Sequence, residues 1–298
     1  MPVYKPGMDV GMNLPVMVPG LDRDTILDWS RRIDAGPFSS LAAGERITFP
    51  NPELMVTMAA AAAATERVRL VLTVLVLPMH SAALKAKEVA TLDVISGGRV
   101  TLGVGVGARV EDYRAVGARF DGNRMARLER QVALLRRTWA GEPVEPGMAP
   151  IEPRPVQAGG PPILAGCLAQ KAIERAARWA DGICGFSFGP AREEVTFAFD
   201  TARRAWAAAG RARPRLVTSF WFALNPRARE QLDRYIARYL NFLGPGVAAQ
   251  VAPTCTVTSP GRLREALREV ADLGGDEVIL VPTNADPGEV DRVADLLT

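Results

Sequence analysis

The sequence predicts an α/β fold, an eight-stranded parallel β/α barrel with insertions. Eight short apolar or β-branched runs alternate with longer stretches of helical periodicity, which is typical of parallel strands joined by helices. The chain has 298 residues, 48% of them hydrophobic, enough for the large core of such a barrel. A barrel of this kind occupies about 250 residues as one domain, so we expect a single domain over 1–298. An open, doubly wound sheet is the alternative.

The elements of the N-terminal half follow from caps and periodicity. Asp22 can cap a helix that ends at Gly36, and the glycine pair 97–98 can stop a later helix, because glycine readily adopts the left-handed backbone of a helix end. The run 69–77 is almost continuously apolar, as expected of a parallel strand buried on both faces. Residues 108–121 are polar and irregular. The expected order is a strand at 8–14, a helix at 22–36, a strand at 39–43, a helix at 53–66, a strand at 69–77, a helix from 82, a strand at 100–106 and an amphipathic helix at 124–139.

The C-terminal half contains four further strands and two insertions. Residues 142–162 are rich in proline and glycine and 244–258 are irregular, so we expect both to be excursions from the barrel. Ser259 can cap a helix that has Pro260 in its first turn. The expected order is a strand at 162–165, a helix at 169–180, a strand at 182–186, a helix at 190–210, a strand at 216–224, a helix at 226–243, a helix at 259–274, a strand at 277–281 and a last helix from 286.

The strand at 100–106 alternates valine or leucine with small residues. Gly103, Gly105 and Gly107 share one parity and therefore one face, whereas Val104 and Val106 point to the other face and should pack on helices. Glycine weakens a strand, so its repetition indicates the close approach of a ligand or of another backbone. A dinucleotide fold would need a helix immediately after the glycines, and the sequence offers none there. We expect the Gly105 face to lie open to a flat cofactor ring.

Composition and charge exclude several kinds of function. The net charge is +3 without any block of like charge, which argues against a nucleic-acid partner. No apolar run reaches the roughly 18 residues of a membrane span, and the start MPVYKPGMDVG lacks the regions of a signal peptide. Three cysteines without a CxxC pair and a single histidine argue against a zinc site. We expect no metal, no membrane and a cytoplasmic enzyme with a small-molecule substrate.

Four segments together resemble the luciferase-like flavin-dependent oxidoreductases. They are LDVISGGRVTLGVGVG at 92–107, RVRLVLTVLVLP at 67–78, RWADGI at 178–183 and GGDEVILVP at 274–282. The resemblance implies a TIM barrel and a reduced flavin, either FMN used with oxygen for monooxygenation or the deazaflavin coenzyme F-420 used for hydride transfer. It also implies a homodimer formed by helices of the N-terminal half, where the alanine run 59–64 would allow close helix approach.

In a β/α barrel the active site lies at the carboxyl ends of the strands. The expected strands end in Glu45 and Arg46, in Thr73 and His80, in Gly105, Val106 and Gly107, and in Gly166 and Cys167 followed by Gln170.

Three of these residues are candidates for catalysis. The family that the chain resembles often has histidine at the position of Arg46; arginine remains protonated, so it can stabilise an anion but cannot shuttle a proton. Glu45 precedes it, and a salt bridge with a neighbour is the alternative role for Arg46. His80, the only histidine, could act as a general acid or base, or could serve only in packing.

The resemblance also implies a set of cofactor-binding residues. An arginine aligned with Arg124 contacts the flavin phosphate in related proteins, whereas a second family arginine is replaced here by Val106. The segment from Gly166 to Gln170 opens a helix and could hold a phosphate, although Cys167 stands where glycine is common and packs more readily than it reacts. The expected cofactor residues are Thr73, Gly105, Val106, Gly107, Arg124, Gly166, Cys167 and Gln170. The departures at Arg46, Val106 and Cys167 favour the alternative, a cofactor-free barrel that acts as a lyase, cyclase or binding subunit.

Overall fold

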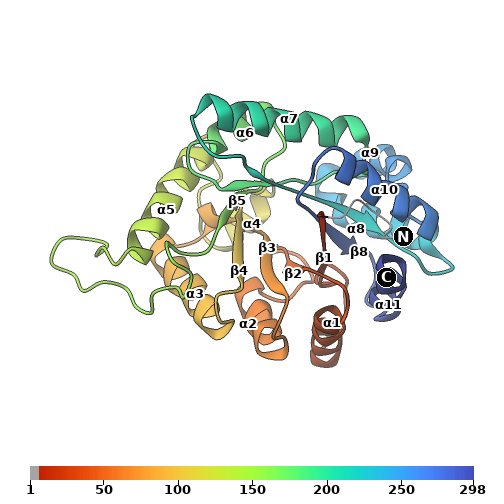
Figure 1. Cartoon of the computed structure of the whole chain (residues 1–298), viewed down its shortest axis with the longest axis horizontal. Helices are drawn as coiled ribbons and strands as arrows, with labels where there is room; N and C mark the ends of the chain where they lie inside the picture. Colours follow the sequence, from red (N-terminus) through yellow and green to blue (C-terminus); the bar gives the residue numbers. More distant parts are fainter. Residues whose placement is uncertain (1–6) are drawn as a thin grey trace.

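The computed structural model describes residues 7–298, and its eight parallel strands form a closed barrel in sequence order (Figure 1). β1 pairs with β8 and completes the ring. The predicted β/α barrel is therefore confirmed. Residues 1–6, part of the stretch that argued against a signal peptide, lie outside the described residues. The strands are β1 (Asp9–Asn13), β2 (Ser40–Ala43), β3 (Arg69–Leu75), β4 (Val100–Val104), β5 (Ile163–Ala165), β6 (Gly182–Cys184), β7 (Arg215–Phe222) and β8 (Glu277–Pro282).

Helices surround the strands, and most begin and end where the sequence indicates. The Asp22 carboxylate accepts a hydrogen bond from the Thr25 N–H at 2.8 Å, and the Ser259 hydroxyl accepts one from the Arg262 N–H. The helices are α1 (Arg23–Ala35), α2 (Leu54–Ala64), α3 (Ala82–Ile95), α4 (Val110–Ala115), α5 (Arg124–Trp139), α6 (Gln170–Ala176), α7 (Arg192–Ala208), α8 (Ala228–Tyr239), α9 (Pro245–Val251), α10 (Pro260–Asp272) and α11 (Gly288–Leu297), with 3₁₀ turns η1 (Leu77–Met79), η2 (Asn241–Leu243) and η3 (Ala252–Thr254).

Two stretches that the sequence predicts to be irregular contain helices. α4 lies within 108–121, and side-chain hydrogen bonds hold it: the Asp112 carboxylate accepts from the distant Thr48 N–H at 2.7 Å, and the Tyr113 hydroxyl donates to the Val106 carbonyl at 2.7 Å. α9 and η3 occupy most of 244–258. A six-residue and a seven-residue helix are too short to show a helical period. The loop 142–162, in contrast, has no helix or strand and projects from the barrel beside α3 and α5, as expected (Figure 1).

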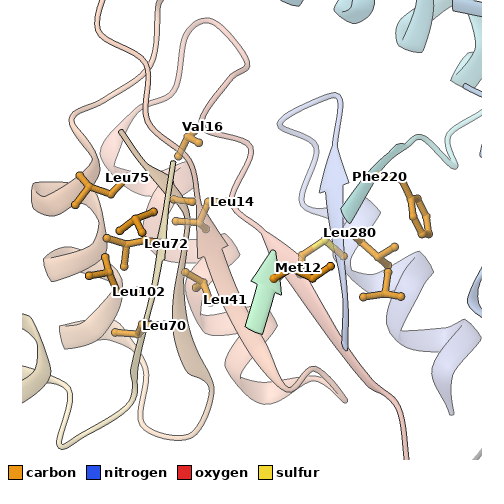
Figure 2. Close-up of a cluster of buried hydrophobic side chains, with 14 of the residues drawn as sticks. Met12, Leu14, Val16, Leu41, Leu70, Leu72, Leu75, Leu102, Phe220 and Leu280 are labelled. Carbon is orange, nitrogen blue, oxygen red and sulfur yellow. The ribbon is translucent and has the colours of Figure 1, made fainter. Parts of the chain in front are cut away.

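The hydrophobic core lies mainly between the strands and the helices. Figure 2 shows Met12, Leu41, Leu72 and Leu280 within this layer, and each is fully buried. The opposite faces of the strands fill the barrel interior with a second, smaller cluster. That cluster consists of Ala42, Val71, Leu164, Cys184, Val217 and Ile279. Because side chains fill the barrel interior, a functional site is expected at the carboxyl ends of the strands.

Arg99 joins the ends of two helices to the sheet. Its Nε donates to the Ser96 carbonyl at 2.7 Å, Nη1 to the Val68 carbonyl and the Thr65 hydroxyl at 2.9 Å each, and Nη2 to the carbonyls of Ala62 and Thr65 at 3.1 and 2.8 Å. The last carbonyls of a helix have no partner within the helix. Arg99 supplies partners at the C-terminal ends of both α2 and α3, so this residue of the 92–107 segment has a structural role.

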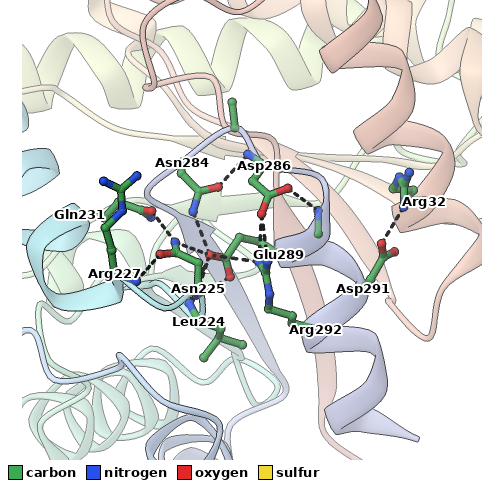
Figure 3. A network of polar contacts seen from close by, with 12 residues as sticks. Arg32, Leu224, Asn225, Arg227, Gln231, Asn284, Asp286, Glu289, Asp291 and Arg292 are labelled. Atoms are coloured by element: carbon green, nitrogen blue, oxygen red, sulfur yellow. Dashed lines mark hydrogen bonds and ion pairs between the residues drawn. The ribbon is translucent and has the colours of Figure 1, made fainter.

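Glu289 fixes the loops that follow β7 and β8. Its buried carboxylate accepts hydrogen bonds from the Leu224 N–H at 3.0 Å, the Asn225 side chain at 3.0 Å and the Asn284 side chain at 2.8 Å (Figure 3). Asn225 also donates to the side chain of Gln231 on α8. This bond fixes the first turns of α8 against the loop that follows β7.

Candidate functional site

Two adjoining cavities open at the carboxyl ends of the strands. The first, here the Arg46 cavity, has a volume of about 200 Å³, and the second, the Trp221 cavity, about 240 Å³. They share five lining residues, so one ligand can extend from one into the other. The shared residues are Met17, Gly44, Thr73, Val74 and Tyr239. The Arg46 cavity is completed by Glu45, Arg46, Val76, Met79, Gly107, Ala108, Arg109, Asp112, Tyr113 and Phe242.

Glu45 and His80 form a contact pair beside the Arg46 cavity. The Glu45 side chain is only 2% exposed, and its Oε1 lies 2.9 Å from His80 Nε2. The other oxygen accepts a hydrogen bond from the Val76 N–H at 2.7 Å. His80 itself does not line the cavity, whereas Glu45 does. A carboxylate between the cavity and an imidazole can pass a proton between them.

Arg46 is buried without hydrogen-bond partners for two of its nitrogens. Its side chain is 8% exposed, and neither Nε nor Nη2 has an acceptor. The guanidinium carbon lies 4.6, 4.7 and 5.1 Å from the ring centres of Phe49, Tyr239 and Phe242. The nearest carboxylate oxygen, of Asp112, is 3.8 Å from Nε. Burial lowers the pKa of Arg46, but arginine remains charged at neutral pH.

A second arginine, Arg109, shares Asp112 with Arg46. Its Nε is buried without a hydrogen bond, 3.5 Å from Asp112 Oδ2. The other Asp112 oxygen already accepts from the N–H and the hydroxyl of Thr48, at 2.7 and 2.6 Å. Two guanidinium groups therefore face one carboxylate. The salt-bridge alternative for Arg46 exists in part, but at a distance too long for a hydrogen bond.

Aromatic rings form one wall of the Trp221 cavity. The centre of the Trp221 ring lies 4.9 Å from that of Phe186, 5.5 Å from Tyr235 and 5.2 Å from Tyr239. Such edge-to-face contacts stabilise the wall beyond simple burial. The neighbours of Trp221 along β7, Phe220 and Phe222, do not line either cavity. Successive side chains of a strand point to opposite faces, so only Trp221 of these three contributes to the cavity wall.

Gly103 of β4 and the glycines that follow it at 105 and 107 do not form an open face. A β-carbon on Gly103 would lie 2.2 Å from the Leu72 carbonyl oxygen, and one on Gly105 would lie 3.0 Å from the Val74 side chain. Gly107, with φ of 60°, faces the Val76 side chain. The sequence left two explanations for these glycines, the close approach of a ligand or of another backbone. At Gly103 it is the backbone of β3 that approaches. The expectation that the Gly105 face is open to a ring is wrong, because Val74 of β3 covers it.

The remaining predicted residues divide into two groups. Thr73 lines both cavities, and Gly166 and Cys167 line the Trp221 cavity. Burial raises the pKa of the Cys167 thiol to about 12, which favours packing over nucleophilic chemistry. Gln170 points along α6 and donates to Glu174 at 2.8 Å.

Gly105, Val106 and Arg124 do not line either cavity. Arg124 lies behind the cavity wall, with its guanidinium carbon 3.5 Å from the Phe120 ring centre and 5.8 Å from that of Tyr113. Its Nη1 is buried without a partner. Tyr113, which lines the Arg46 cavity, therefore separates this unpaired cation from the cavity.

Several lining residues were missed by sequence reasoning. They are Asn13, Arg109, Asp112, Tyr113, Phe186, Tyr235, Tyr239 and Phe242. Arg109 follows the fourth strand by only a few residues, so the strand-end rule could have found it. Tyr235 and Tyr239 are spaced i, i+4 on a helix, which places them on one face but does not say what that face covers.

Within residues 7–298 no cluster of metal-ligating side chains is found. Nor does that part of the chain contain a helix with the length and apolar character needed to cross a bilayer.

A comparison with protein families identifies one family. A family model described as luciferase-like monooxygenase matches residues 8–249. An uncharacterised protein of Mycobacterium tuberculosis is 32% identical over 163 residues, which cover 52% of this chain and 56% of that protein. The match thus spans about half the length of the first curated relatives.

Solved structures match over almost the whole chain. The monooxygenase RslO1 from Streptomyces bottropensis has a TM-score of 0.78 and 25% identity, with 97% of each chain covered. The coenzyme F-420-dependent tetrahydromethanopterin reductase from Methanopyrus kandleri has a TM-score of 0.80 at 17% identity, covering 97% of this chain and 98% of that one. The oxygenating constituent of 3,6-diketocamphane monooxygenase from Pseudomonas putida, in complex with FMN, has a TM-score of 0.73 at 18% identity, with 98% of each chain covered. At such identities the last two show the fold alone.

Proposed function

This chain belongs to the luciferase-like monooxygenase family, and we propose that it is an oxidoreductase that binds reduced FMN or the deazaflavin coenzyme at the carboxyl-terminal mouth and acts on a small organic substrate. The observation that carries the proposal is the pair of adjoining cavities, lined by apolar rings and bordered by guanidinium nitrogens without partners. Two structural neighbours support the proposal: one is described in complex with FMN, and the other as dependent on coenzyme F-420.

The residues present fit a flat ring with an anionic tail. Val74 covers Gly103 and Gly105, and Val74 and Thr73 line both cavities, so a ring would pack against them. Gly166 exposes backbone to the Trp221 cavity. Arg124 has a buried nitrogen without a partner, which a phosphate could satisfy if Tyr113 and the loop before α5 adjusted.

The side chains at the mouth supply binding, orientation and proton handling. When bound, the cofactor would supply the two-electron redox chemistry that side chains lack. Glu45 Oε1 and His80 Nε2 can hold or transfer a proton at the edge of the Arg46 cavity. With a ligand bound, the ring wall around Trp221 would help to exclude water and so strengthen charge interactions in the cavities.

Replacing Arg124 with alanine should weaken cofactor binding if this residue holds the phosphate. The expected loss is about 1.5–3 kcal/mol, the usual contribution of a hydrogen bond to a charged group. Affinity would be measured by fluorescence titration with FMN and with the deazaflavin. Arg130→Ala changes an exposed arginine on the same helix and should leave the affinity unchanged. Equal affinities in both variants would remove Arg124 from the cofactor site.

We also propose a homodimer that uses the outer faces of α2 and α3. Val56, Leu84 and Ile95 line one open groove there and are 72%, 55% and 52% exposed, and a contiguous exposed apolar patch marks an interaction site. Light scattering should give about twice the chain mass of 32.0 kDa. Leu84→Glu should yield monomers because it places a charge in the interface. Val116→Glu, at an exposed apolar position after α4, is the control. A monomeric unmodified chain at micromolar concentration would contradict this proposal.

A further inference from the structure

The Arg46 cavity offers hydrogen-bond donors that the protein itself does not use. Two arginines that line it have buried nitrogens without an acceptor: Nε and Nη2 of Arg46 and Nε of Arg109. Among the described residues, no side-chain oxygen that lines this cavity is left in the same condition. A buried charged donor without an acceptor is costly. The missing component is therefore an acceptor brought by a ligand.

Neither nearby carboxylate can supply that acceptor. Both oxygens of Glu45 are engaged, one by the Val76 N–H and the other by His80. Asp112 gives one oxygen to Thr48 and holds the other 3.8 Å from Arg46 Nε and 3.5 Å from Arg109 Nε. Two fixed positive charges thus share one available negative charge, and a single further anion would balance them.

We propose that the Arg46 cavity binds a carboxylate group of the substrate, and that the substrate is a carboxylate joined to a flat apolar body. Nε and Nη2 lie along one edge of the guanidinium, and such a pair of parallel donors matches the two oxygens of a carboxylate. Phe49, Tyr239 and Phe242 surround the guanidinium carbon at 4.6–5.1 Å. These rings hold Arg46 in place while its Nε and Nη2 have no acceptor, so the site is organised before the ligand arrives.

The apolar body has a place beside the carboxylate. Met17, Val76 and Met79 line the same cavity, which continues past Tyr239 into the ring wall of the Trp221 cavity. A ligand anchored at Arg46 would thus extend toward the region assigned to the cofactor ring. This inference rests on the proposed function, because it assigns the carboxylate to the substrate of the oxidoreductase.

The test uses a pair of ligands with the same shape and different charge. Benzoate and benzamide are titrated calorimetrically into the purified full chain and into the variants Arg46→Met and Arg46→Lys. We expect the unmodified chain to bind benzoate at least about tenfold more tightly than benzamide. Arg46→Met should lose at least about tenfold in benzoate affinity with little change for benzamide. Arg46→Lys should lose affinity as well, because the ammonium lacks the paired donors.

A control variant and the cofactor separate the possible outcomes. Arg203→Met removes another arginine that is half-buried against a ring, Phe199, but lies outside both cavities, and it should bind benzoate normally. The inference is overturned if benzoate does not bind at millimolar concentration, if both ligands bind equally, or if Arg46→Met loses cofactor affinity while keeping benzoate affinity. Benzoate selectivity without any cofactor binding would leave this site standing and remove the proposed oxidoreductase function.

Discussion

Replacing Arg99 with methionine is expected to lower the free energy of unfolding by about 3 kcal/mol or more, because hydrogen bonds to a charged donor contribute about 1.5–3 kcal/mol each and do not simply add. The guanidinium reaches the last carbonyls of α2 and α3 and the carbonyl of Val68 before β3. Methionine keeps the apolar stem but leaves these carbonyls without a partner. Burial lowers the pKa of Arg99, and the side chain stays charged at neutral pH.

Urea unfolding followed by circular dichroism would measure this loss. Arg99→Lys should be intermediate, since it keeps the charge but reaches fewer acceptors. Arg130→Met, at an exposed position of α5, should change stability by less than about 0.5 kcal/mol. If Arg99→Met and Arg130→Met have the same urea midpoint, Arg99 does not hold the helix ends.

Gly103→Ala is expected to destabilise the barrel by about 3 kcal/mol, the upper end of the usual cost of overpacking, or to prevent folding. The added β-carbon would lie 2.2 Å from the carbonyl oxygen of Leu72, which belongs to the neighbouring strand β3. A backbone oxygen cannot move away as a flexible side chain would. The β3–β4 register already shifts between Leu72 and Leu75 at this point, so the two strands would have to separate.

Thermal unfolding of Gly103→Ala beside Gly122→Ala would isolate this effect. Gly122 has no atom within 4 Å of an added β-carbon, so its replacement should be close to neutral. Gly105→Val, by contrast, would press on Val74 at 3.0 Å and on the Gly166 carbonyl at 3.3 Å. It would therefore change packing as well as ligand binding, and cannot serve alone as a test of the cofactor site. A normally stable Gly103→Ala protein would show that β3 and β4 lie farther apart.

Local signals were sufficient to predict the barrel. Asp22 and Ser259 cap their helices, and the glycine pair at 97–98 ends α3 with φ of 65° and 84°. The apolar run at β3 and the alternation at β4 predicted the positions of these strands correctly. A parallel strand that is buried on both faces consists mainly of apolar residues, so it can be recognised in the sequence. Caps and periodicity are properties of neighbouring residues, so they can be read without a structure.

The candidate site was predicted only in part, because its composition depends on contacts between distant elements. The strand-end rule correctly brought Glu45, Arg46 and Thr73 to the mouth. It could not show that Tyr239 and Phe242, almost 200 residues later, pack around Arg46. Nor could it show that Val74 would fill the space that the β4 glycines leave. Side-chain packing between neighbouring strands has no local signature.

Binding of the cofactor at the carboxyl-terminal mouth is the central claim, and an equilibrium titration tests it most directly. The purified full chain would be titrated with FMN and with the deazaflavin coenzyme, each in its oxidised and reduced form, and fluorescence would report occupancy beside Trp221. The account predicts saturable, one-to-one binding of at least one reduced cofactor at micromolar concentration. Failure of all four forms to bind would contradict it and would favour a cofactor-free barrel that acts as a lyase, cyclase or binding subunit.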